Sequence, residues 1–286
     1  MTSNIGGEIT MKKKIAKLLT AGLLVSMMLT GCGGGGDDAQ GSAASSAPAA
    51  KGDGTVYAVE LGSAGEDAAK EKGFEYNTVT AQADALMEVA AGTSDAAIID
   101  LLMAGSMVGE GTSYPDMVLG EKLTEEKYGA GCRKDSDLTS FINQVLYEAD
   151  QDGTMKKTAE KYGVQESLLE QPESKFEQAA EDSDVQYIKD KGKLIVGITE
   201  FAPMDYKDEN GEWIGFDADM AKLVAKKLGV DIEFVVIEWD AKVMELESKA
   251  VDVVWNGMTL NDSVLNTLNC TNAYCNNAQV IVTPGK

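Results

Sequence analysis

Residues 191–229, KGKLIVGITEFAPMDYKDENGEWIGFDADMAKLVAKKLG, predict a strand, a loop, a β-turn and a helix in that order. Lys193 to Ile198 (KLIVGI) is a short apolar run with β-branched residues, which is typical of a strand buried in a parallel sheet. Asp208 to Gly211 (DENG) predicts a turn, because asparagine and glycine tolerate a positive φ. A helix should follow, with Asp217 as a candidate N-cap and Gly229 at its end. Its apolar residues recur at helical spacing: Met220, Leu223, Val224 and Leu228.

A short motif stands at the start of this helix. Gly215 to Met220 (GFDADM) matches G-F-D-x-D-apolar, and it follows a strand, an aromatic loop and a hairpin. In this the chain resembles the bacterial extracellular solute-binding proteins of the polar amino-acid type (family 3). The resemblance implies a two-lobe periplasmic-binding-protein-like (type II) fold of the α/β class, in which each lobe is a mostly parallel sheet flanked by helices and a cleft separates the lobes. The alternation of predicted strands and helices along the chain also favours this class.

The order of the predicted segments differs from that of the family. Residues 55–132 resemble its second lobe (lobe 2), 133–185 the C-terminal helices of lobe 1 plus a polar linker, and 186–286 the rest of lobe 1. In the family the segment quoted above lies just after the secretion signal, whereas here it starts near residue 185. The resemblance therefore predicts a circular permutation in which about residues 163–185 join the old ends.

A targeting segment is predicted at residues 1–32, a signal peptide with a lipobox. Three lysines precede an apolar run that is too short to span a membrane, and Leu29 to Cys32 (LTGC) ends it. Lipidation of Cys32 would hold the protein at the extracellular face of the cell membrane; the alternative is an ordinary signal peptide with an accidental cysteine. Residues 33–54, rich in glycine, serine and alanine, predict a flexible linker.

The composition excludes several kinds of site and partner. The chain has 25 basic and 47 acidic side chains and a net charge of −22, which disfavours nucleic acid and anionic lipid as partners. Attachment to a membrane would then depend on the lipid. There is no histidine, which excludes a His-based catalytic triad and a histidine-ligated zinc site. Neither a metal nor a cofactor is predicted.

Three cysteines remain besides Cys32, an odd number for an exported protein. One alternative is a Cys270–Cys275 disulfide. Another is Cys132–Cys275, if the two strands that cross between the lobes lie side by side. The third is that all three are reduced, buried thiols.

Two features of lobe 2 are candidate ligand contacts. Gly62 to Gly65 (GSAG) lies between a predicted strand and a helix, where backbone N–H groups attract an anion; the alternative is a plain helix N-cap. The resemblance places a ligand carboxylate at the amides of Ser63 and Ala64. Asp100 ends an apolar strand, so its carboxylate should be paired or should face a cleft. The family places the α-ammonium of the ligand at this aspartate, and the alternative is again a helix N-cap.

By the same resemblance, lobe 1 supplies the other contacts. Phe201 and Trp239 would sandwich the side chain of the ligand, although both could be ordinary core residues. Asn256 and Gly257 would offer carbonyl or amide groups, with the Gly257 carbonyl accepting from the α-ammonium. Thr259 would donate to the carboxylate through its N–H and its hydroxyl. These loops follow predicted strands, and ligands of such folds bind at the carboxyl ends of strands.

Two departures from the family pattern concern the ligand. Val264 stands where the family usually has an arginine that grips the carboxylate through two hydrogen bonds, and Ala64 replaces a threonine. Carboxylate binding is then weaker, or Arg133 or a lysine supplies it, or the ligand is not a standard α-amino acid. Ile198 replaces the acidic residue of relatives selective for basic amino acids, which argues against a Lys/Arg pocket, although Glu200 is nearby.

The leading hypothesis is a lipid-anchored substrate-binding protein of an ABC importer. It would capture an amino acid, an amine or a similar small zwitterion by closing its cleft and pass it to the permease, without catalysis. One alternative is an enzyme, since a few relatives are dehydratases of small carboxylic acids, although no acid/base pair is evident in the sequence. The other alternative is a rearranged binding domain that folds but does not transport.

Overall fold

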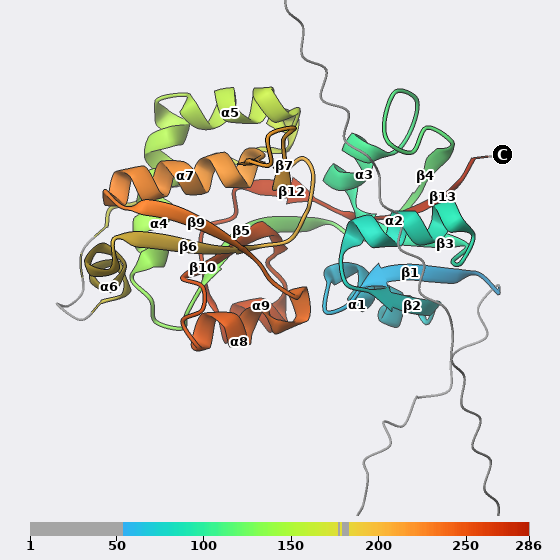
Figure 1. Ribbon diagram of the computed structural model, residues 1–286, viewed down its shortest axis with the longest axis horizontal. Coiled ribbons are helices and arrows are strands. Elements are labelled where there is room, and N and C mark those ends of the chain that lie inside the picture. Colours follow the sequence, from blue (N-terminus) through green and yellow to red (C-terminus); the bar gives the residue numbers. More distant parts are fainter. Residues whose placement is uncertain (1–53, 177, 179–182, 286) are drawn as a thin grey trace, which may run out of the picture. The chain divides into compact units, whose positions relative to one another are not determined.

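Two mixed β-sheets, each built from segments that are far apart in the sequence, form the frame of the chain (Figure 1). The computed structural model describes residues 54–176, 178 and 183–285. The predicted signal peptide, the lipidation site Cys32 and the linker up to residue 53 lie outside these residues. None of the helices in the described ranges is both long and apolar enough to cross a bilayer.

The first sheet, which we call the lobe 2 sheet, has the strand order β2-β1-β3-β13-β4. β1 runs parallel to β2 and β3, whereas β13 lies antiparallel between β3 and β4. Helices α1, α2 and α3 connect its strands. The bounds are β1 Val56–Glu60, α1 Ala64–Lys72, β2 Glu75–Val79, α2 Gln82–Ala91, β3 Ala96–Asp100, α3 Leu101–Met107, β4 Met117–Lys122 and β13 Gln279–Pro284.

The second sheet, the lobe 1 sheet, has the order β11-β5-β10-β6-β9, and β12 also pairs with β5. β6 is parallel to β9 and β10, and β5 is antiparallel to β10, β11 and β12. Its strands are β5 Glu126–Cys132, β6 Lys193–Ile198, β9 Asp231–Val236, β10 Val253–Thr259, β11 Asn269–Cys270 and β12 Cys275–Asn277, with the hairpin β7 Tyr206–Lys207 and β8 Trp213–Ile214. Its helices are α4 Leu138–Gln151, α5 Thr154–Tyr162, α6 Asp184–Lys191, α7 Phe216–Leu228, α8 Lys242–Glu247 and α9 Asp262–Thr267, with the 3₁₀ turns η1 Gln165–Ser167 and η2 Trp239–Ala241.

The predicted α/β class is confirmed, and each sheet is mixed. Parallel strands joined by helices form one side of each sheet, as the alternating sequence pattern predicts. Antiparallel strands that cross from the other lobe then extend it: β13 in the lobe 2 sheet and β5 in the lobe 1 sheet.

Each of the two strands that cross between the lobes pairs in the sheet of the other lobe. β5 ends the segment 55–132, which was predicted to be lobe 2, but it pairs with β10 in the lobe 1 sheet. β13 lies in the segment 186–286, which was predicted to be lobe 1, but it pairs with β3 and β4. The reason is that a strand joins the sheet whose edge can satisfy its backbone N–H and C=O groups, whichever segment precedes it in the chain.

Helices α4 and α5 pack against α7 and so belong to lobe 1. Lys161 and Tyr162 of α5 both reach Asp219 of α7, at 2.8 Å and 2.7 Å. Lys227 at the end of α7 pairs with Glu148 of α4 at 2.8 Å. These contacts attach the segment that precedes residue 163 to the helix of the GFDADM motif.

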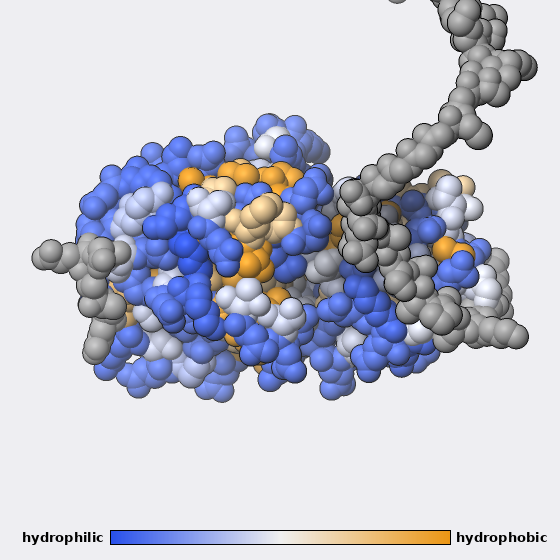
Figure 2. Space-filling model, turned by 90° about the horizontal axis from the view of Figure 1, so that it is seen from below, coloured by the Kyte–Doolittle hydropathy of each residue, from blue (hydrophilic) through white to orange (hydrophobic). Residues whose placement is uncertain are grey.

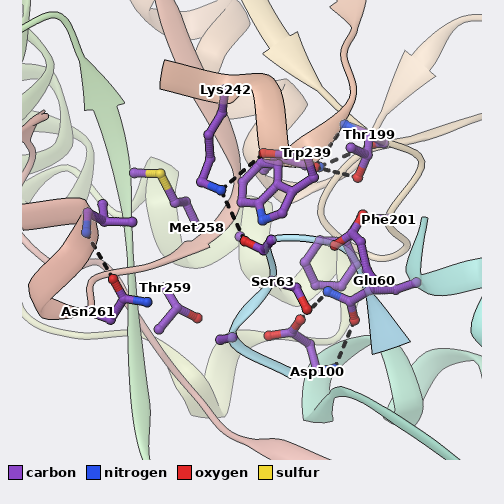
Figure 3. A pocket seen from close by; sticks show the side chains of 16 residues that line it. Glu60, Ser63, Asp100, Thr199, Phe201, Trp239, Lys242, Met258, Thr259 and Asn261 are labelled. Carbon is purple, nitrogen blue, oxygen red and sulfur yellow. Dashed lines mark hydrogen bonds between the residues drawn. The ribbon is translucent and has the colours of Figure 1, made fainter. Parts of the chain in front are cut away.

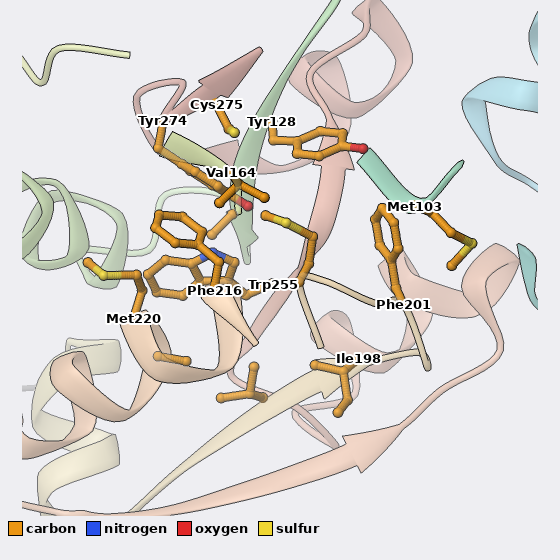
Figure 4. Packing of buried hydrophobic residues seen from close by; sticks show 14 of the residues in the cluster. Met103, Tyr128, Val164, Ile198, Phe201, Phe216, Met220, Trp255, Tyr274 and Cys275 are labelled. Atoms are coloured by element: carbon orange, nitrogen blue, oxygen red, sulfur yellow. The ribbon is translucent and has the colours of Figure 1, made fainter. Parts of the chain in front are cut away.

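The largest apolar cluster surrounds Trp255, which is fully buried (Figure 4). The ring of Tyr274 lies between Phe216 and Trp255, with ring centroids 5.9 Å and 6.1 Å away. Three segments distant in sequence, the start of α7, the middle of β10 and the residue before β12, therefore meet at one aromatic contact. By contrast, the face of the molecule shown in Figure 2 is mostly hydrophilic.

The three cysteines of the described residues are free thiols, which selects the third of the predicted alternatives. Cys132 and Cys275 are buried, and Cys270 is half-buried. Burial raises the pKa of the Cys132 thiol to about 12 and that of Cys270 to about 11. These thiols are therefore protonated and poorly nucleophilic at neutral pH.

Arg133, just after β5, is the centre of a buried ion-pair network in lobe 1. Its guanidinium pairs with Asp184 of α6 at 3.0 Å and with Asp252 at 3.5 Å. It also donates to the carbonyl oxygens of Leu246 and Val251. Asp252 is fully buried and takes a second cation, Lys191, at 2.7 Å. The network joins the end of the crossing strand to three other segments of the lobe.

We expect Arg133→Ala to lower the free energy of unfolding by about 3 kcal/mol, because it removes one of the two cations of a fully buried carboxylate. Urea denaturation followed by circular dichroism measures the change. Lys193→Ala is the control, since the pair of Lys193 with Glu233 is exposed on both sides and its loss should leave the urea midpoint unchanged. Equal effects of the two substitutions would contradict the prediction.

Candidate functional site

A pocket lies where the carboxyl ends of β1 and β3 meet β10 and the loops that follow β6 and β9. About 420 Å³ of space, part of it open to solvent, lies between its sixteen lining residues, whose side chains are drawn in Figure 3. All eight ligand contacts predicted from the sequence line it: Ser63, Ala64, Asp100, Phe201, Trp239, Asn256, Gly257 and Thr259. Residues of the two lobes that are up to almost two hundred positions apart are thus brought together at one place.

Phe201 and Trp239 form the apolar part of the wall. Both are more than nine-tenths buried, and the ring of Phe201 meets that of Tyr128 edge-on, with centroids 6.3 Å apart. Gly257 packs directly against Phe201, since a Cβ atom at this position would lie 2.3 Å from Cε1 of the ring. Its φ of 56° is also in the left-handed region. Glycine is therefore required at position 257 for Phe201 to stay in place.

Asp217 of the GFDADM motif does not line the pocket but fixes the backbone of Gly257, which does. Its Oδ2 accepts hydrogen bonds from the Gly257 N–H at 2.7 Å and from the Tyr274 hydroxyl at 2.8 Å. The predicted role of Asp217 as a helix cap is wrong: α7 begins after Gly215 with no side-chain cap, and the carboxylate turns into the core, where these donors replace water. Because the N–H of Gly257 is occupied, the predicted ligand contact at this residue depends on its carbonyl.

The Asn256 side chain orders the loop that follows β6. Its Oδ1 accepts from the N–H and the hydroxyl of Thr199, at 2.8 Å and 2.6 Å. Its Nδ2 donates to the Thr199 carbonyl and to Asp205 Oδ2, at 3.2 Å and 2.9 Å. The side-chain amide of Asn256 thus makes its hydrogen bonds within the protein. It positions Thr199 and Phe201, and it is not available to a ligand. Burial, and next the neighbouring Asp217, raise the pKa of Asp205.

Ser63 caps helix α1 with its side chain. Its Oγ accepts from the Glu66 N–H at 3.2 Å, and Glu66 Oε2 in turn accepts from the Gly62 N–H at 2.8 Å. This exchange resembles a capping box and confirms the N-cap alternative for the hydroxyl. The predicted contact of a ligand carboxylate with the backbone amides of Ser63 and Ala64 stays a prediction.

Asp100 is buried at the end of β3 and does not cap α3 with its side chain. Its Oδ1 accepts hydrogen bonds from the Tyr128 hydroxyl and from the side-chain amides of Asn277 and Gln279. Its Oδ2 accepts one, from the Gln82 side chain. The expectation that this carboxylate is either paired or faces a cleft is met on both counts. Burial, followed by the nearby Glu126, raises the pKa of Asp100 to about 7.

The hydroxyl of Thr259 makes its hydrogen bond within the protein. It donates to Glu126 Oε2 at 2.9 Å, and the same oxygen accepts from the side chains of Asn277 and Gln279 at 3.1 Å each. A hydroxyl has one proton to donate, and here that proton is bound to Glu126, so the hydrogen bond from this hydroxyl to a ligand carboxylate stays a prediction. The carboxylate of Glu126 takes the proton because it lies within reach on the crossing strand β5.

Two further lobe 2 side chains line the pocket that the sequence analysis did not single out, Glu60 and Gln82. Glu60 ends β1, which is parallel to β3, so it occupies the place in its strand that Asp100 occupies in the neighbouring one. Gln82, at the start of α2, donates to the Asp100 carboxylate and lies close enough to Glu60 to lower its pKa. Burial, and then repulsion by Asp100, raise the pKa of Glu60 to about 8. An acidic residue at the end of each of two predicted strands, Glu60 and Asp100, was the signal that could have found it.

Lys242, at the start of α8, is the lysine that lines the pocket, whereas Arg133 is held in its own network elsewhere. The suggestion that Arg133 supplies carboxylate binding is therefore wrong, because its guanidinium is consumed by Asp184, Asp252 and two carbonyls. Nζ of Lys242 donates to the carbonyls of Gly62 and Trp239 at 3.1 Å and 3.0 Å. It also lies 4.8 Å from the centroid of the Trp239 ring (Figure 3). Burial lowers the pKa of this ammonium group.

Two curated proteins are among those similar to this chain. The L-cystine-binding protein of Escherichia coli (strain K12) is 32% identical over 84 residues, which are 29% of this chain and 32% of that protein. A probable amino-acid ABC transporter-binding protein of Haemophilus influenzae is 34% identical over 110 residues, 38% of this chain and 42% of that one. The chain thus spans about a third to two fifths of the length of these relatives.

Among solved structures, the arginine-bound form of domain 1 from TmArgBP of T. maritima is 31% identical. It aligns with a TM-score of 0.31 over 34% of this chain and 84% of that domain. Residues 194–286 match the family described as bacterial extracellular solute-binding proteins, family 3. These residues contain the GFDADM motif, Phe201, Trp239 and β10. Over residues 194–286 the chain is thus similar to the bacterial extracellular solute-binding proteins of family 3, and its two mixed sheets agree with the α/β class.

Proposed function

We propose that this chain captures an amino acid or a similar small amine-bearing solute for an ABC importer. The observation that carries the proposal is the pocket itself, in which an aromatic wall from lobe 1 meets two buried carboxyls at the strand ends of lobe 2. An aromatic wall suits an aliphatic or aromatic side chain, and a carboxylate suits an ammonium group. The names of the two relatives, one a cystine-binding and one an amino-acid-binding protein, support the same class of ligand.

Closure of the two lobes over the ligand is the proposed mechanism. Lys242 of lobe 1 donates to the Gly62 carbonyl of lobe 2, and Ser106 of lobe 2 donates to the Ala202 carbonyl of lobe 1 at 3.1 Å. A Cβ atom on Gly62 would lie 2.9 Å from Asp240, so the lobes approach each other closely at this glycine. A ligand that contacts both lobes favours the state in which these contacts form.

We further propose how the protein is attached to the membrane and how its segments are ordered along the chain. Cys32 is the proposed lipid site, which would hold the protein at the extracellular face of the membrane beside the permease. The proposed circular permutation is supported by the contacts of α4 and α5, which precede β6 in the chain but pack on α7 of the same lobe. A rearranged chain that folds without transporting remains the competing interpretation, and the first experiment below distinguishes the two.

A dehydratase is a second candidate function, favoured by one observation. Glu60 and Asp100, whose pKa values burial raises to about 8 and about 7, stand side by side in the pocket. Two carboxyls that titrate near neutral pH are suited to general acid–base catalysis. Turnover of prephenate or of a related small carboxylic acid, lost in Glu60→Gln, would favour this candidate over the binding protein.

A thermal-shift screen of the full chain against the twenty amino acids and common amines should yield a ligand. A ligand at 100 times its Kd raises the free energy of unfolding by about 2.7 kcal/mol, which is several degrees in Tm. Asp100→Asn should abolish the shift and keep a cooperative melt, because it removes the charge and little volume. A cooperative melt that no compound shifts would instead support the rearranged, non-transporting chain.

Gly62→Ala should weaken ligand binding about tenfold or more, because the added methyl group meets Asp240 and keeps the lobes apart. Isothermal titration with the ligand from the screen measures the loss. Gly92→Ala is the matched control: its φ of 71° equals that of Gly62, 72°, within a degree, but its Cβ would meet nothing within 4 Å. Both variants should lose similar stability, and equal ligand affinity in the two would refute closure at Gly62.

A further inference from the structure

Two carboxyls that do not line the pocket lie directly behind its wall. Asp205 precedes β7, Asp217 is in the first turn of α7, and both are fully buried. The Asn256 side chain donates to Asp205 Oδ2 at 2.9 Å. The next residue of β10, Gly257, donates its N–H to Asp217 Oδ2 at 2.7 Å. Two acidic side chains are therefore buried behind two successive residues that do line the pocket.

The backbone also brings these two carboxyls together. The Asp217 N–H donates to the carbonyl of Met204, the residue before Asp205, at 3.0 Å. The start of α7 packs on the same peptide, since a Cβ atom at Gly215 would lie 2.9 Å from the Asp205 nitrogen. The two side chains thus begin from backbone segments in direct contact, so a charge on one acts strongly on the other.

The two carboxyls differ in the number of donors that they bind. Besides the backbone N–H of β10, Asp217 Oδ2 accepts from the Tyr274 hydroxyl at 2.8 Å. The indole of Trp255 also lies near enough to Asp217 to favour its ionised form. Asp205 has one donor among the described residues, the Asn256 amide. Because hydrogen bonds to a carboxylate stabilise its charge, Asp217 is the better place for a negative charge.

Neither carboxyl is paired with a cation in the part of the chain that the structure describes. Lys222 of α7 attracts the charge of Asp205, but its Nζ donates to a backbone carbonyl of β8 and to Asp219. The other titratable groups that face the pair are the Tyr274 hydroxyl and the Cys275 thiol, and burial raises the pKa of both, so they are neutral. Two negative charges at this place would therefore be costly.

One oxygen of each carboxyl is left without a donor. The Oδ1 atoms of Asp205 and Asp217 are both buried, and neither has a hydrogen-bond partner among the described residues. A proton on one of them would turn that atom into a donor, whereas the other remains an acceptor. One proton shared by the pair would thus remove one of the two charges and supply the missing donor.

We propose that Asp205 and Asp217 share a single proton at neutral pH, which Asp205 carries, and that Asp205 is thereby a positioning residue of the pocket. As a neutral acid it holds the Asn256 amide, which orders the loop after β6, while the ionised Asp217 holds Gly257. Burial, and then Asp217, raise the pKa of Asp205, and burial raises that of Asp217 to about 7. The inference concerns the wall of the pocket, so it does not rest on the proposed function.

Urea denaturation of the full chain and of Asp205→Asn at pH 6 and pH 8 tests the proposal. Folded Asp205 keeps its proton over this range, whereas in the unfolded chain it is ionised above about pH 4. Each pH unit therefore lowers the folding equilibrium constant of the unsubstituted chain about tenfold relative to the variant, so Asp205→Asn should gain about a hundredfold. Asp208→Asn is the matched control. The Glu212 N–H lowers the pKa of this turn carboxylate, so its effect should not change with pH.

An effect of Asp205→Asn that is equal at the two pH values would refute the proposal, because an ionised Asp205 with a purely structural role gives that result. Failure of this variant to fold would refute it too, since an amide of the same size should replace a neutral acid. Infrared spectroscopy at pH 6 is a second readout: part of the absorption of protonated carboxyl groups should be lost in Asp205→Asn and kept in Asp217→Asn. The reverse result would overturn the assignment of the proton to Asp205. Neither measurement uses a solute, so the inference and the proposed function fail independently.

Discussion

The hydrogen bond from the Gly257 N–H to the buried Asp217 carboxylate is the constraint on which the pocket depends. It ties the start of α7 to the irregular part of β10, and the Tyr274 hydroxyl ties the segment before β12 to the same oxygen. Gly257 is thereby held at a positive φ directly under Phe201, which stands on the loop ordered by Asn256. The GFDADM motif thus shapes the ligand wall through the backbone of β10, without lining the pocket itself.

The crossing strands extend this dependence to both lobes. β5 carries Tyr128, whose hydroxyl reaches Asp100, and Glu126, which takes the Thr259 hydroxyl. The segment from β12 to β13 carries Asn277 and Gln279, which bind the same two carboxylates. The polar base of the pocket is therefore built from the strands that join the lobes. A movement of one lobe against the other must act on these hydrogen bonds, so the proposed binding of a ligand would be coupled to lobe position through them.

Much of the site could be predicted, because strand ends and motifs are local. Asp100, Phe201, Trp239 and Gly257 follow predicted strands, and parallel strands bring their carboxyl ends to one edge. The directions of two side chains differ from the prediction. Asp217 points into the core, and the Thr259 hydroxyl donates to Glu126. Those directions are set by partners 40 and 133 residues away, respectively, which local patterns do not contain. The crossing strand β13 was expected, but its pairing with β3 was not predicted, for the same reason.

Burial of Glu60 and Asp100 lowers the stability of the folded protein at neutral pH. Burial raises the pKa of Glu60 to about 8 and that of Asp100 to about 7, so at neutral pH the folded protein holds protons that the unfolded chain has lost. Their contribution to stability therefore falls as pH rises from the unfolded values near 4 through 7 and 8. Apolar residues at these strand ends would pack without that loss. The two carboxyls lie at adjacent strand ends in one pocket with Trp239 and Phe201. A cation from the proposed solute would stabilise their ionised forms. Binding of that solute would therefore also stabilise the fold.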